Sequence, residues 1–107
     1  MFGIFKNMFA QENNSQLSEA IQNGAFLVDV RTPVEFSEGS AKGAVNVPLD
    51  KLHSHLEKLK GKKSIIVFCK SGGRSTQAKS ILEQKGFHNV INGITWENVQ
   101  SVINSNK

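Results

Sequence analysis

The segment Ser64–Phe68 restricts the fold of this chain more than any other. Its sequence, SIIVF, is apolar on both faces of an extended strand, and such strands usually lie in the middle of a parallel sheet. Apolar runs and helix-like stretches alternate before and after it, along a chain of 107 residues. This alternation predicts one α/β domain with a mostly parallel sheet.

The remaining elements are predicted from apolar runs, capping residues and helix-stopping glycines. Strands are expected at 25–30, 44–47 and 88–91, and helices at 15–24, 32–39, 49–59, 74–84 and 95–103. Thr32, Pro33 and Glu35 form the pattern of a capping box with proline at the first helical position. Leucines recur at helical spacing between residues 49 and 59. The tail after Ile103 is expected to be frayed.

The two ends of the chain differ in character. Residues 1–14 are predicted to be an apolar, partly ordered segment, and residues 15–104 to be the folded domain. The first ten residues, MFGIFKNMFA, are too short and interrupted for a membrane span, and they lack the features of a signal peptide. We expect them to pack on the domain as an amphipathic turn, with a weak membrane or partner contact as the alternative. The prediction is a cytoplasmic protein without stable membrane association.

Charge and metal-ligating residues exclude several functions. The net charge is +4, and the densest basic cluster comprises Lys58, Lys60, Lys62 and Lys63. A solvated turn is the favoured interpretation, because no aromatic residue interleaves the lysines as nucleic-acid binding would require. We therefore predict no nucleic-acid partner. His53 and His55 point to different sides of a helix, so no metal site is predicted, and no cofactor is expected.

Cys69 is the only cysteine of the chain, so an intrachain disulfide is excluded and a reducing compartment is favoured. It follows the buried strand, and Lys70, Ser71, Gly72 and Gly73 lead from it into the next helix. Ligands of open α/β sheets bind beyond the carboxyl ends of the strands.

The loop after this cysteine favours an anion. Glycines allow successive N–H groups to form an anion-binding nest, and the following helix adds its positive end. Arg74 and Lys70 add positive charge. The sequence therefore predicts an exposed, electropositive thiol with a lowered pKa, whose thiolate is a nucleophile. A buried structural cysteine is the alternative. A nucleotide-binding loop is disfavoured, because the spacing of its glycines and lysine is missing.

Four stretches of the chain resemble the rhodanese family. The loop Cys69-Lys70-Ser71-Gly72-Gly73-Arg74-Ser75 is similar to the family's active-site loop, Cys-x-x-Gly-x-Arg-Ser/Thr. The other matching stretches are LVDVRTPVEF at 27–36, GAVNVP at 43–48 and NGITW at 92–96. One position departs from the pattern: Ser40 stands where the family usually has histidine. We expect this change to alter local packing rather than chemistry.

The resemblance implies a three-layer α/β/α fold and a sulfurtransferase without a cofactor. Cys69 would take a sulfur atom from a donor such as thiosulfate or a persulfide and pass it to cyanide or a thiol. An acceptor protein is left open.

The resemblance also implies roles for the residues around this cysteine. Arg74 would bind the anionic donor or hold the loop, and Ser75 would donate a hydrogen bond or simply begin the helix. Lys70 to Ser75 would together form the substrate-binding loop. Asp29, Arg31 and Glu35 are assigned structural support, with direct substrate contact of Asp29 and Arg31 as the alternative. The helical spacing of Trp96 and Val99, rather than the resemblance, assigns Trp96 to packing.

Two other functions remain open at this stage. Phosphatases and arsenate reductases use a Cys-x5-Arg loop to bind an oxyanion, and some of these phosphatases share the rhodanese-like fold. Arg74 follows Cys69 after four intervening residues rather than five, and the shorter loop favours a single sulfur atom. The second possibility is a partner-binding module without catalysis, which the presence of Cys69 disfavours.

Overall fold

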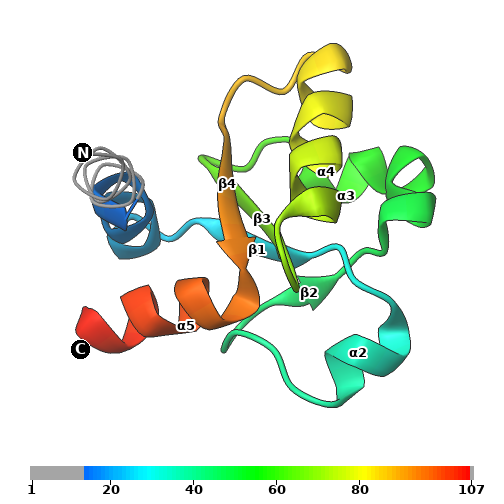
Figure 1. Cartoon of the computed structure of the whole chain (residues 1–107). Helices are drawn as coiled ribbons and strands as arrows, with labels where there is room; N and C mark the ends of the chain where they lie inside the picture. The colour runs from blue at the N-terminus through cyan, green and yellow to red at the C-terminus, as the bar shows by residue number, and fades with distance from the viewer. Residues whose placement is uncertain (1–13, 107) are drawn as a thin grey trace, which may run out of the picture.

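A computed structural model describes residues 14–106 of the chain (Figure 1). Its sheet has four strands in the order β2-β1-β3-β4, and every neighbouring pair is parallel. The strands are β1 (Phe26–Asp29), β2 (Val45–Asn46), β3 (Ile65–Cys69) and β4 (Val90–Thr95). All five residues of β3 are buried, and β3 lies between β1 and β4, as its apolar sequence predicted.

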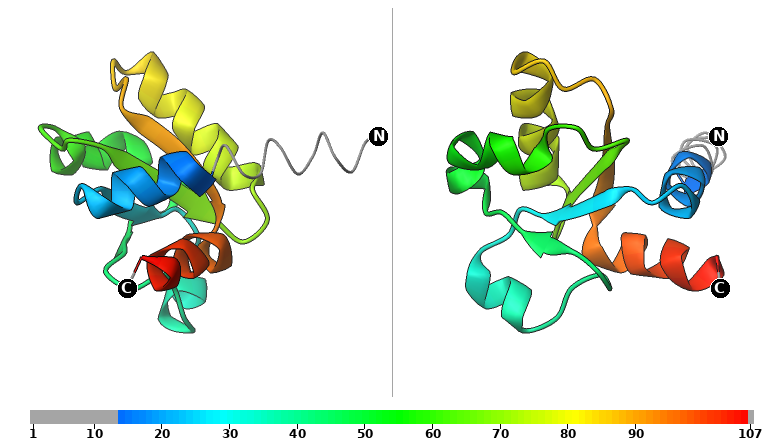
Figure 2. Two further views of the ribbon diagram at one scale, coloured as in Figure 1. Left: turned by 90° about the vertical axis from the view of Figure 1, so that its left-hand side faces the viewer. Right: turned by 180° about the vertical axis from the view of Figure 1, so that it is seen from behind.

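Helices cover both faces of the sheet, so the fold is the predicted three-layer α/β/α arrangement. The elements are α2 (Pro33–Ser37), the 3-10 helix η1 (Leu49–His55), α3 (Leu56–Leu59), α4 (Gly73–Gln84) and α5 (Trp96–Ser105), and residues 14–22 are also helical. Buried side chains of η1, α3 and α4 pack on one face. Side chains of α5 and of the helical residues 14–22 pack on the other, as the views in Figures 1 and 2 show.

Several predicted elements agree closely with the structure. Thr32 caps α2, Pro33 is its first residue, and both hydrogen bonds of the capping box with Glu35 are present. Thr95 caps α5 through the N–H of Asn98. This last helix continues to Ser105, two residues beyond its predicted end.

The leucine-rich segment differs from the prediction in its helix type. Leu52 and Leu59 are buried as the spacing indicated, but residues 49–55 form a 3-10 helix rather than an α-helix. Pro48 precedes it without a side-chain cap, and the N–H of Lys51 bonds the carbonyl of Pro48 three residues back. This tight i to i+3 pairing is characteristic of 3-10 geometry.

The prediction for β4 was wrong at both ends, because the strand begins at Val90 and continues to Thr95. It passes through an irregularity in its pairing with β3, where Asn92 lies opposite Val67 and Ile94 lies opposite Phe68. Gly93 is therefore the extra residue of a β-bulge. A bulge is not visible in an apolar pattern, which explains why the strand seemed to stop at residue 91.

The parallel arrangement brings the ends of β1, β3 and β4 to one edge of the sheet. Asp29, Cys69 and Thr95 are their last residues, so the predicted loop lies at the edge where α/β proteins bind ligands. No helix within residues 14–106 combines the length and apolar character needed to cross a bilayer. The apolar side chains of the first ten residues lie outside the described part of the chain.

Candidate active site

The Cys69 sulfur lies inside the loop that joins β3 to α4. The backbone N–H of Gly72 donates to Sγ at 3.0 Å, and that of Ser75 donates at 3.4 Å. Gly72 turns the chain back toward the sulfur with a φ of 102°, a left-handed conformation that glycine adopts readily. The loop thus directs backbone donors at one atom, an arrangement that stabilises negative charge there.

The thiol is buried, with 1% of Cys69 exposed. The prediction of an exposed thiol was therefore wrong. The residue belongs to the end of the buried strand β3, and the loop folds back over it instead of leaving it on the surface. Lys70 and Ser71 are exposed, so the direct contacts to sulfur come from backbone groups rather than from the lysine charge.

Opposing influences act on the ionisation of Cys69. Burial is the largest of them and raises the pKa of the thiol. The Ser75 side chain and the backbone N–H groups of Ser75, Gly72 and Ser71 lower it, and together they bring the pKa below its ordinary value. The site therefore holds more of its cysteine as thiolate than a free cysteine would at the same pH.

Ser75 is fully buried in the first turn of α4. Its hydroxyl lies 3.1 Å from the carbonyl oxygen of Gly72 and 3.4 Å from that of Ile94. The side chain therefore contacts both the loop and β4 beside the sulfur. From the sequence position of Ser75, a hydrogen-bonding role and a plain helix start were equally compatible.

Arg74 is paired with Glu35, a contact that the sequence did not reveal. The Arg74 guanidinium donates to Oε1 of Glu35 at 2.7 Å and to Oε2 at 3.1 Å. The same carboxylate accepts from the N–H and the hydroxyl of Thr32 at 3.1 and 3.0 Å. The pKa of Glu35 is lowered to about 2. The hydrogen bond from Arg74 is the largest cause, and the hydrogen bond from the backbone N–H of Thr32 is the second. Glu35 thus connects the start of α2 to the cysteine loop.

Asp29 and Arg31 form a buried ion pair at the carboxyl end of β1. Nη2 of Arg31 lies 2.8 Å from Oδ2 of Asp29. Arg31 is 5% exposed and Asp29 is 0% exposed. The guanidinium also donates to the carbonyl of Gly39 at 2.6 Å. Ser40 donates to the same Asp29 oxygen at 2.7 Å. The serine that departs from the family pattern therefore supplies a hydrogen bond to this buried carboxylate.

Ile94 is a site residue that sequence reasoning missed. Its carbonyl oxygen lies 3.6 Å from Cys69 Sγ, in position to accept a hydrogen bond from the protonated thiol. A Cβ added at Gly72 would lie 3.1 Å from Cγ2 of Ile94, so the Ile94 side chain lies against the loop. The Asn92-Gly93 pair is a turn signal, and it was the only indication in the sequence of unusual backbone here.

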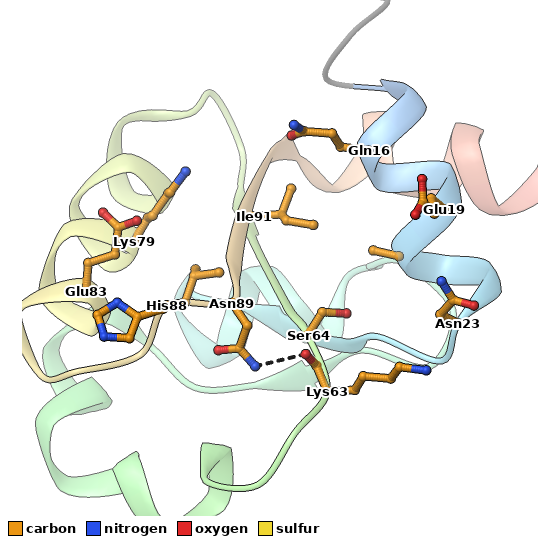
Figure 3. A pocket seen from close by; sticks show the side chains of 12 residues that line it. Gln16, Glu19, Asn23, Lys63, Ser64, Lys79, Glu83, His88, Asn89 and Ile91 are labelled. Carbon is orange, nitrogen blue, oxygen red and sulfur yellow. Dashed lines mark hydrogen bonds between the residues drawn. The ribbon is translucent and has the colours of Figure 1, made fainter.

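A hollow of about 550 Å³ lies elsewhere, between the helical residues 14–22, α4 and the start of β4 (Figure 3). Side chains of both charges line it, among them Glu19, Lys63, Lys79 and Glu83. Ser64 and Val90 place it near the amino ends of β3 and β4. It is therefore at the opposite edge of the sheet from Cys69.

Comparison with known proteins supports the fold and the family. The sequence model of the family described as "Rhodanese-like domain" matches residues 13–93. A sulfurtransferase of Allochromatium vinosum is 33% identical over 66 residues, covering 62% of each chain. Thiosulfate sulfurtransferase 16 of Arabidopsis thaliana is 41% identical over 78 residues, covering 59% of this chain and 62% of its own.

Solved structures of similar proteins also support this fold. A rhodanese-related protein of Thermoplasma volcanium superimposes with a TM-score of 0.67 at 30% identity, covering 86% of this chain and 88% of that one. The chain spans about three fifths of the length of the curated relatives described above. Their names support sulfur transfer as the activity at the level of the family.

Proposed function

The chain belongs to the family of rhodanese-like domains, and from this we propose that it is a sulfurtransferase that carries sulfur as a persulfide on Cys69. Thiosulfate or a persulfide is the proposed donor, and cyanide or a thiol is the proposed acceptor. The observation that carries the proposal is the convergence of the Gly72 and Ser75 N–H groups on Sγ.

In the first half-reaction the Cys69 thiolate attacks the outer sulfur of thiosulfate. The S–S bond of the donor breaks, and sulfite leaves with its electron pair. The product is a persulfide whose negative charge resides on the outer sulfur. In the second half-reaction a nucleophilic acceptor attacks this sulfur, and the bond to Sγ breaks to restore the thiolate. Two easier displacements thus replace one difficult transfer.

The residues around the sulfur favour both half-reactions in the same way. The N–H groups of the loop are fixed before the reaction, so they stabilise the thiolate that attacks and the thiolate that leaves. Arg74 is held at the loop by its ion pair with Glu35, so its proposed role is to hold the loop in place around the sulfur. Asp29 and Arg31 support the neighbouring loops from within the protein. A reactive thiol without a partner cysteine suits the reducing cytoplasm.

The geometry does not favour the oxyanion enzymes considered from the sequence. In those enzymes the loop N–H groups must face the oxygens of a bound tetrahedral anion. Here the N–H groups of Gly72 and Ser75 donate hydrogen bonds to the sulfur atom itself.

The test is the intact mass of the purified protein after incubation with thiosulfate, beside a Cys69→Ser control. We expect the wild type alone to gain the mass of one sulfur atom, and cyanide or a thiol to remove it. A wild type that gains no sulfur from thiosulfate or from a persulfide donor would contradict the proposal. Hydrolysis of an aryl phosphate that is lost in Cys69→Ser would instead support the oxyanion alternative.

A further inference from the structure

Ile94 has a backbone conformation that its side chain makes costly. Its φ is 73°, and among residues 14–106 it is the one non-glycine residue with a positive φ. A β-branched residue in this region is a genuine outlier, and holding it there strains the backbone. Glycine or asparagine would adopt the same φ with less strain, so the strain calls for an explanation.

The backbone at this position is fixed from several sides. Gly93 before it is the extra residue of the bulge, and its carbonyl accepts a hydrogen bond from Nδ2 of Asn98 at 3.0 Å. The Asn92 side chain accepts from the N–H of Ile94 at 2.9 Å and donates to Thr76 at 3.2 Å. These contacts hold the left-handed conformation without any contribution from the isoleucine side chain.

The side chain itself lies at the border between the loop and solvent. It is 41% exposed, and its Cγ2 lies against Gly72, whose N–H bonds the Cys69 sulfur. A strained residue that leaves part of an apolar side chain in water gains little stability from it. The position instead suits contact with a molecule that approaches the sulfur.

We propose that Ile94 is a specificity-determining residue, which contacts the hydrocarbon part of an organic thiol or persulfide as its sulfur approaches Cys69. The inference rests on the proposed function in identifying that molecule as a sulfur acceptor or donor. The proposal gives the site a preference for sulfur compounds that carry an aliphatic group over small hydrated ions such as cyanide. These ions present no hydrocarbon surface to Ile94.

The contact is measurable without sulfur transfer, by modification of Cys69 with methyl and propyl methanethiosulfonate. The thiolate attacks the alkylthio sulfur, the S–S bond breaks, and methanesulfinate leaves with the electron pair. The readout is the ratio of the propyl to the methyl rate, divided by the same ratio for free cysteine. Each methylene buried on contact favours binding by about fourfold, so half burial of two methylenes gives a ratio of about 4.

Variants separate this contact from a structural role. Ile94→Asn tolerates the same φ and is expected to lower the ratio toward 1, whereas Ile94→Val keeps a branched apolar side chain and retains most of it. Val34→Asn is the matched control, because Val34 is the other large exposed hydrophobic residue of the described chain, at 68%. It is expected to keep the wild-type ratio.

The outcomes distinguish the two proposals. A wild-type ratio near 1, or an equal loss in Ile94→Asn and Val34→Asn, overturns the role of Ile94 even if Cys69 carries sulfur. A ratio near 4 that Ile94→Asn alone abolishes supports the role even if no persulfide forms, in which case only the proposed function fails.

Discussion

Replacing Gly93 by alanine tests whether packing sets the bulge beside the candidate active site. A Cβ at this position would lie 2.5 Å from Cγ2 of Val99 and 3.0 Å from Cγ2 of Ile66. Both side chains are fully buried, and both belong to the core between the sheet and α5. Because both are packed within this core, α5 is expected to shift away from β4 or a rotamer to strain.

Overpacking of this kind costs about 1–3 kcal/mol. For a domain of about this size, 1 kcal/mol corresponds to about 4 °C in the melting temperature. We therefore expect Gly93→Ala to lower the melting temperature by about 4–12 °C, measured by circular dichroism. The denaturant midpoint should fall without a change in the slope m, because the surface exposed on unfolding is the same.

Gly73→Ala is the matched control. It makes the same chemical change at the first residue of α4, where an added Cβ meets nothing within 4 Å. The lower entropy of the unfolded chain should stabilise this variant by about 0.5 kcal/mol. If Gly93→Ala melts within a degree or two of the wild type, the packing argument is refuted. A Val99→Ala change should cost less in the Gly93→Ala background than alone, because it removes the clashing methyl.

Two further predictions concern the titrating groups of the site. Glu35 has a pKa lowered to about 2 from an unfolded value of 4.5, so its contribution to stability is complete above pH 4.5 and is lost as the pH falls through 2. An NMR titration of Glu35 should give this low midpoint, and Arg74→Gln should move the midpoint upward. An unchanged midpoint in Arg74→Gln would show that the ion pair does not cause the low pKa. Ser75→Ala removes a group that lowers the pKa of Cys69, so the thiolate should appear at a higher pH in its ultraviolet absorbance, and a midpoint equal to that of the wild type would contradict the assigned role of the hydroxyl.

Local and periodic signals account for the parts of the fold that were predicted. The run of apolar residues in β3 has to be buried on both faces, and the structure confirms its place inside the sheet. The capping box of Thr32 and Glu35 needs only neighbouring residues to form, so the start of α2 was also predicted. The position of Cys69 at the end of a strand follows from the same reasoning.

Contacts between distant segments account for what was missed. Arg74 and Glu35 are 39 residues apart, and no pattern in either segment indicates their pairing. The left-handed Ile94 depends on side chains from α4 and α5, which the sequence cannot place beside it. The burial of Cys69 follows from a loop that folds back, whereas glycines and basic residues alone suggested an open surface.

The burial of Cys69 also affects how this protein withstands oxidation. A disulfide between two copies requires their sulfur atoms to approach to about 2 Å, and two cysteines that are each only 1% exposed cannot approach so closely while both loops stay closed. Folded molecules should therefore resist covalent dimerisation in air, although the pKa of their thiol is lowered. Small oxidants such as peroxide are expected to be the main route to inactivation, through the sulfenic acid and its higher oxides.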